Sequence, residues 1–93
     1  FNPLIFLATG HAFDNPHDME AVNIFYRSLR IVAVDLNCKS ISLDRYWLGY
    51  LAKHHLSASG LVLSDPRYLN EKGHEVVAEA ILKALYRALP ALI

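Results

Sequence analysis

The sequence predicts an α/β protein with a parallel sheet, of the kind found in one half of a doubly wound domain. Two short apolar runs, residues 4–8 and 31–36, are typical of strands that are buried on both faces. Segments with helical periodicity follow each run, so that strands and helices alternate along the chain. A sheet of only two strands leaves parts of its faces and its outer edges without other elements to cover them. We therefore expect residues 1–93 to be a single α/β segment that completes a larger sheet.

The first predicted strand, residues 4–8, ends at Thr9 and Gly10, and a loop follows it. Asn15 and Pro16 are a cap and first-turn pair, which predicts that a helix begins there. The apolar residues of that helix recur with a spacing of three and four, which is the pattern of one helix face: Val22, Phe25, Tyr26 and Leu29.

The second predicted strand covers residues 31–36, because this run is apolar and rich in β-branched residues. Ser42 then predicts the start of a second helix. Gly49 lowers the stability of that helix by about 1 kcal/mol relative to alanine. Its apolar side chains still fall on one face: Leu43, Tyr46, Trp47, Tyr50 and Leu51. Gly60 opens a short apolar piece, residues 61–63.

The last helix has the strongest pattern in the chain. Asn70 is a good N-cap residue, and Pro90 is predicted to end the helix. The predicted apolar face contains Val77, Ile81, Ala84, Leu85 and Ala88. Charged residues recur every four positions on the opposite side, and Glu79 precedes Lys83 in the favourable order: Glu75, Glu79, Lys83 and Arg87.

The composition excludes several classes of partner. Hydrophobic residues make up 54% of the chain, which is more than so short a chain can easily bury alone. The nine basic residues balance nine acidic ones and never form a run, so no nucleic-acid partner is expected. No apolar run reaches the length of about 18 residues that a transmembrane segment requires. The single Cys38 excludes a disulfide-stapled scaffold.

Residues 64–74 carry the motif that bears on chemistry. They read Ser-Asp-Pro-Arg-Tyr-Leu-Asn-Glu-Lys-Gly-His and lead directly into the last helix. This segment resembles the last motif of the SGNH (GDSL-type) esterases and lipases, in which Asp-x-x-His is followed by Pro-Asn-x-x-Gly-His. The positions that match the family are Asp65, Asn70, Gly73 and His74. Tyr68 stands where the family has its catalytic histidine, and Leu69 stands at the usual proline.

The resemblance implies a three-layer, flavodoxin-like parallel sheet, of which this chain is the C-terminal half. It also implies cleavage of acyl or acetyl esters by a serine triad, without a cofactor. Asp65 then holds the position of the triad acid, and Tyr68 occupies the position of the base. A tyrosine, with a pKa of about 10, stays protonated near neutral pH and is a donor rather than a base. We therefore expect ester hydrolysis to be impaired.

The serine and the oxyanion-hole donors of that family are not among these residues. The resemblance therefore implies a partner, which is either the N-terminal half of the same fold or a second chain. His11 and Asp14 follow the first predicted strand, at an edge where α/β sheets bind ligands, and are candidates to line a substrate cleft. No metal site is expected, because the histidines lack the spacing of metal ligands.

The alternative function is a non-catalytic α/β binding or assembly module derived from a hydrolase fold. Its apolar surface would dock on another chain or form a homo-oligomer. This alternative follows from the high apolar content and from the tyrosine at the base position.

Overall fold

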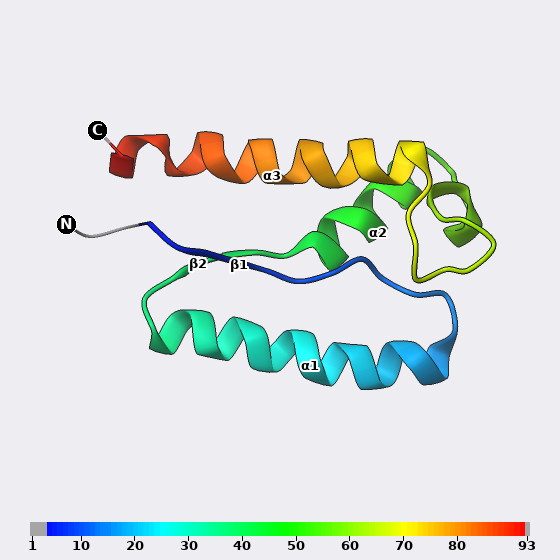
Figure 1. The fold of residues 1–93 in the computed structure, drawn as a ribbon, viewed down its shortest axis with the longest axis horizontal. Coiled ribbons are helices and arrows are strands. Elements are labelled where there is room, and N and C mark those ends of the chain that lie inside the picture. The colour runs from blue at the N-terminus through cyan, green and yellow to red at the C-terminus, as the bar shows by residue number, and fades with distance from the viewer. Residues whose placement is uncertain (1–3, 93) are drawn as a thin grey trace.

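A computed structural model describes residues 4–92 of the chain, with side chains described as far as residue 88. The elements follow in the order β1 (Phe6–Ala8), α1 (Pro16–Asp35), β2 (Lys39–Ile41), α2 (Leu43–Lys53), the 3₁₀ helix η1 (Ala58–Leu61) and α3 (Glu71–Leu92). The two strands pair in parallel, with Leu7 opposite Ser40. Helices α1 and α3 lie on opposite sides of this strand pair (Figure 1).

The prediction of a three-layer, flavodoxin-like parallel sheet is wrong. Within residues 4–92 the sheet has only two strands, and each of them is three residues long. Most of the described residues are helical. A sheet this short cannot form the continuous central layer that a doubly wound domain requires.

The strand predicted at residues 31–36 is also wrong, because residues 31–35 are the last turns of α1. Their burial shows why the apolar run misleads. Ala33 is 1% exposed and continues the buried face of Tyr26, whereas Val34 is 78% exposed. A helix that has already begun gains a hydrogen bond for each added residue, and this gain outweighs the weak strand preference of the β-branched residues.

The end of α1 is set by a hydrogen-bonded C-cap that follows the apolar run. Asn37 adopts a left-handed conformation with φ 55°. The Cys38 amide donates to the Ala33 carbonyl at 2.7 Å, and the Asn37 amide donates to the Val34 carbonyl at 3.1 Å. These two bonds form a Schellman motif, in which asparagine is one of the few non-glycine residues tolerated at the left-handed position. The second strand therefore begins only at Lys39.

The predicted starts of the helices are confirmed. The Asn15 side chain accepts hydrogen bonds from the amides of His17, at 2.9 Å, and Asp18, at 3.4 Å, and Pro16 begins α1. α2 begins directly after Ser42, although the serine side chain makes no capping hydrogen bond. The Asn70 side chain accepts a hydrogen bond from the Gly73 amide at 2.8 Å at the start of α3.

The buried face of α3 differs in part from the predicted one. Val76 and Ala80 are buried, whereas Ile81 and Leu85 are exposed. Gly73 explains the difference, because a β-carbon at this position would overlap the Leu61 carbonyl oxygen. This close approach turns the face of α3 that carries Gly73, Val76 and Ala80 towards the core.

The predicted end of α3 is wrong, since the helix continues through Pro90 to Leu92. A proline near the end of a helix removes one amide hydrogen bond, and its fixed φ of about −65° is compatible with the helical backbone. Only the last turn is affected.

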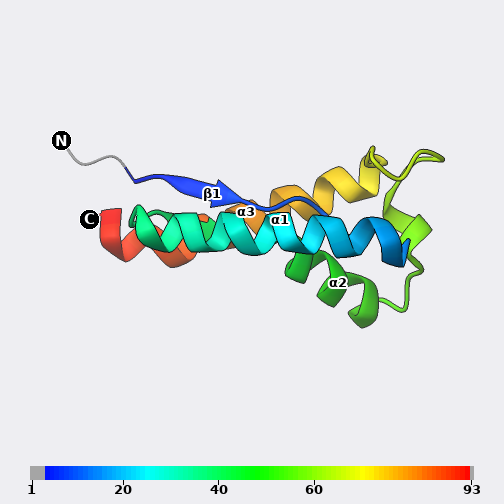
Figure 2. The same cartoon turned by 90° about the horizontal axis from the view of Figure 1, so that it is seen from below.

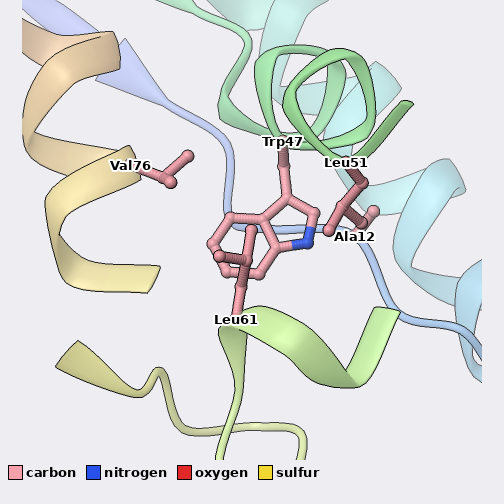
Figure 3. Close-up of a cluster of buried hydrophobic side chains, with 5 residues drawn as sticks. All are labelled: Ala12, Trp47, Leu51, Leu61 and Val76. Atoms are coloured by element: carbon pink, nitrogen blue, oxygen red, sulfur yellow. The ribbon is translucent and has the colours of Figure 1, made fainter. Parts of the chain in front are cut away.

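The core is small and is centred on Trp47, which is 1% exposed. Leu61 and Val76 pack against it together with Leu51 and Ala12, and the five side chains come from four different parts of the chain (Figure 3). A second cluster joins Ile41, Leu43 and Ala80 between β2 and α3. These clusters hold the loop after β1 and the segment before α3 against the same helix, α2, and so position the candidate site.

Candidate functional site

A crevice of about 420 Å³ lies between the loop that follows β1 and the segment from η1 to the Asp65 loop. Its apolar lining is provided by Ala12, Phe13, Val62, Leu63 and Pro66, and its polar lining includes Asp14, Ser59 and Ser64. The loop after β1 forms one wall of the crevice, and loops that follow strands commonly bind ligands in α/β proteins. Its volume lies within the range of about 300 to 1,000 Å³ that is typical of small-molecule sites.

The Asp65 carboxylate, the predicted triad acid, is engaged by Arg67. It accepts from the Arg67 amide at 3.1 Å and from the guanidinium, where the shortest contact joins Nη2 and Oδ2 at 2.7 Å. The side-chain hydrogen bonds from Arg67 lower the pKa of Asp65 below its ordinary value. The carboxylate is therefore ionised at neutral pH, and its partner is a permanent cation rather than a base.

Tyr68, at the predicted base position, lies on the same turn but points to solvent. Its side chain is 58% exposed, and its amide donates to the Asp65 carbonyl at 3.1 Å. The Arg67 guanidinium carbon lies 5.8 Å from the centre of the Tyr68 ring. Arg67 thus contacts both residues that the resemblance assigns to the triad, and their catalytic roles stay a prediction.

His11 lies against the same loop. Its Nε2 is 2.8 Å from the Pro66 carbonyl oxygen, and because a carbonyl only accepts, Nε2 carries the proton. The imidazole also packs at 5.0 Å from the Trp47 ring and at 4.7 Å from the Phe13 ring, measured between ring centres. The structure therefore brings His11 to the Asp65 loop, 55 positions along the chain, and places Asp14 in the lining of the neighbouring crevice.

The strongest polar cluster was not predicted from the sequence. Asp44, in the first turn of α2, is 4% exposed. It accepts a hydrogen bond from the Thr9 hydroxyl at 2.8 Å and two from the Arg30 guanidinium, at 3.1 and 3.2 Å. The Thr9 hydroxyl in turn accepts from the Asp44 amide. The sequence carried only a local signal for this cluster, namely an acidic residue one position after the start of a helix. It did not identify Thr9 and Arg30 as partners, because both lie far from Asp44 along the chain.

This cluster connects three elements rather than forming a reactive site. Burial raises the pKa of Asp44, but the hydrogen bonds from Arg30 and Thr9 outweigh it, so that the pKa lies below its ordinary value. The ionised carboxylate holds the end of β1, the C-terminal half of α1 and the start of α2 together.

In the part of the chain that the structure describes, no three histidine, cysteine, aspartate or glutamate side chains converge in a way that could hold a metal ion. Among the helices of residues 4–92, none is both long and apolar enough to span a bilayer.

Comparison of the chain with protein-family models, with curated proteins and with solved structures found no match. The resemblance of residues 64–74 to the SGNH esterases therefore rests on the motif alone.

Proposed function

We propose that the chain is a non-catalytic α/β assembly module that binds another polypeptide through the outer face of α1. The outer face is defined by six apolar residues that are at least 44% exposed: Ile24, Phe25, Ile31, Val32, Val34 and Leu36. Seen from below, α1 lies in front of α3, and none of the elements within residues 4–92 covers the side of α1 that faces the viewer (Figure 2). This exposure is the observation that carries the proposal.

The outward side of a surface helix is usually polar, whereas the outward side of α1 exposes large apolar side chains among its polar ones. Burial of a Phe, Ile, Leu or Val side chain is favourable by about 1.5 to 3 kcal/mol. Five such residues on α1, together with Leu36 at its C-cap, therefore provide a large driving force for association. The inner face of α1 already packs on the chain through Tyr26 and Ala33, so the outer face is additional to the core.

Two further features favour a polypeptide over a lipid surface. Exposed apolar residues also occur on α3, including Leu82 at 55% and Tyr86 at 69%. α1 and α3 lie on opposite sides of the strand pair, and a flat surface can cover only one of them (Figure 1). In addition, each of the two strands is paired with a neighbour along only one of its edges within the described residues. A strand from another polypeptide can pair with the backbone amides and carbonyls of the other edge.

The geometry of the Asp65 loop supports the non-catalytic part of the proposal. The acid is bound by Arg67, and the position of the base is held by Tyr68, whose side chain points to solvent. A general base has to accept a proton within hydrogen-bond reach, and the loop offers none at the position that the motif assigns to it.

The assembly function is tested with a double substitution on the outer face, Phe25→Ser with Val32→Ser. We expect it to weaken association of the chain by at least about a hundredfold, because each of the two serines removes apolar area worth more than about 1.4 kcal/mol, or about tenfold in affinity. Light scattering over a concentration series measures the effect. Leu63→Ser is the matched control, since Leu63 is also 53% exposed but lies in a loop. Equal association and equal binding of an apolar dye by both variants would contradict the proposal.

Cleavage of acyl or acetyl esters is a second candidate, favoured by the crevice beside the Asp65 loop. Ser64 lines this crevice, and His11 is hydrogen bonded to the same loop. If Asp65 acts as a triad acid, an imidazole at position 68 restores the base that the family motif contains. General-base catalysis contributes about 10² to 10⁴-fold in rate.

The second candidate is tested with Tyr68→His and a chromogenic acetyl ester. We expect no hydrolysis above the buffer rate by the unaltered chain. An increase of about 100-fold in Tyr68→His would support ester cleavage. Leu48→His is the matched control, because Leu48 is 53% exposed and lies on α2, outside both the motif and the crevice. If both variants hydrolyse the ester equally slowly, ester cleavage is rejected and the assembly function remains.

A further inference from the structure

A groove beside β2 gathers basic side chains that are far apart in the sequence. It lies between the end of β2, the start of α2 and the middle of α3, and its volume is about 360 Å³. Arg45, Lys83 and Arg87 line it. A smaller hollow of about 170 Å³ shares Ser40 and Arg87 with the groove and adds Lys39. The fold therefore brings together cations that the sequence shows only as isolated residues.

The positive charge of the groove is balanced only in part by acidic neighbours. Neither hollow has a carboxylate in its lining. Lys83 is paired with Glu79 at 3.3 Å, but the ion pairs found among the described side chains do not include Lys39, Arg45 or Arg87. Several like charges around one hollow repel each other, and a bound anion removes this repulsion.

Neutral donors complete the lining. Ser42 immediately precedes α2, and its hydroxyl makes no hydrogen bond to the first turn of the helix. The hydroxyl is therefore available to a ligand. Ser40 and Tyr46 also line the groove. The start of α2 adds the partial positive charge of aligned peptide dipoles, which supports the cationic side chains. A phosphate monoester, with about two negative charges and three acceptor oxygens, matches this set of donors.

We propose that this groove binds the phosphate group of a small phosphorylated molecule. Arg45 and Arg87 donate charge-assisted hydrogen bonds to the phosphate oxygens, and Ser42 donates from the helix start. The groove volume of about 360 Å³ suits a small ligand. An extended nucleic acid would require a longer basic stripe than this cluster provides.

The proposal is tested by nuclear magnetic resonance on the full ¹⁵N-labelled chain, with inorganic phosphate, phenyl phosphate and phenol as probes. We expect saturable shifts of the amide signals of residues 40–45 and 83–87 with both phosphates and none with phenol. Arg45→Gln and Arg87→Gln should each weaken binding by about tenfold, because each removes a charge-assisted hydrogen bond. Added sodium chloride should weaken it further.

Lys72→Gln is the matched control, since it removes one positive charge about 16 Å along α3 from Lys83. It should leave phosphate binding unchanged. The proposal is overturned if no saturable shift occurs at about 20 mM phosphate, or if all three variants bind equally. Tighter binding of a short single-stranded oligonucleotide at the same signals would also overturn it, because the ligand would then be a nucleic acid.

Discussion

Substitution of Asp44 by alanine is expected to destabilise the fold by about 3 to 5 kcal/mol, the usual cost of removing one partner from a buried ion pair. The carboxylate is 4% exposed and accepts hydrogen bonds from Thr9 and Arg30. Without it, the Thr9 hydroxyl loses its acceptor, and the Arg30 guanidinium stays partly buried without its counter-ion. The Arg30 side chain is 23% exposed and regains some water, which favours the lower end of this range.

Urea unfolding of both chains measures this difference. Asp35→Ala is a suitable control, because Asp35 is an exposed residue at the end of α1. We expect that control to change the free energy of unfolding by less than about 0.5 kcal/mol. If Asp44→Ala costs no more than the control, the Thr9–Asp44–Arg30 cluster does not hold the three elements together.

The contribution of Asp44 should also depend on pH. Its pKa in the folded state lies below its ordinary value, because the hydrogen bonds from Arg30 and Thr9 outweigh the effect of burial. A group with a lowered folded pKa stabilises the protein above its unfolded pKa, which is about 3.9 for aspartate. The stability difference between wild type and Asp44→Ala should therefore be constant from about pH 5 to 7. It should shrink as the pH falls through the folded pKa.

Replacement of Gly73 by alanine is expected to destabilise the fold by about 2 to 3 kcal/mol, at the upper end of what overpacking typically costs. The added β-carbon would overlap the Leu61 carbonyl oxygen and press on Leu69. The Leu61 carbonyl also accepts a hydrogen bond from the Asn70 amide, so it cannot move without breaking that bond. α3 must therefore shift away from the core.

Gly49→Ala provides the matched control for this substitution. Gly49 also lies inside a helix, but a β-carbon there would meet no atom within 4 Å. Alanine should stabilise α2 by up to about 1 kcal/mol, because it restricts the unfolded chain more than glycine does. Thermal unfolding of the two variants should therefore show opposite changes. A loss of stability at position 49, or none at position 73, would contradict the packing of α3 on Leu61.

The helix starts could be predicted because their signals are local. Asn15 and Asn70 each satisfy backbone amides within three residues of their own position. The apolar run 31–36 misled the prediction because an exposed apolar helix face and a buried strand have the same composition. The residue that distinguishes them is Asn37, whose left-handed conformation ends α1.

The candidate site could be predicted only in part, for a similar reason. The loop carrying Asp65 and the edge carrying His11 were visible as separate segments, and their contact is a product of the fold. The ion pair between Asp65 and Arg67 could have been predicted from the sequence, because the two residues are close together along the chain. The pairing of Asp44 with Thr9 spans 35 positions and depends on the parallel pairing of two very short strands.

The most direct test of the assembly function is the mass of the unaltered chain in solution over a range of concentrations, measured together with the binding of an apolar dye. The outer face of α1 predicts either a mass that rises above 10.5 kDa with concentration or a monomer that binds the dye strongly. A constant mass of 10.5 kDa without dye binding would contradict the proposal that this face is covered by another polypeptide.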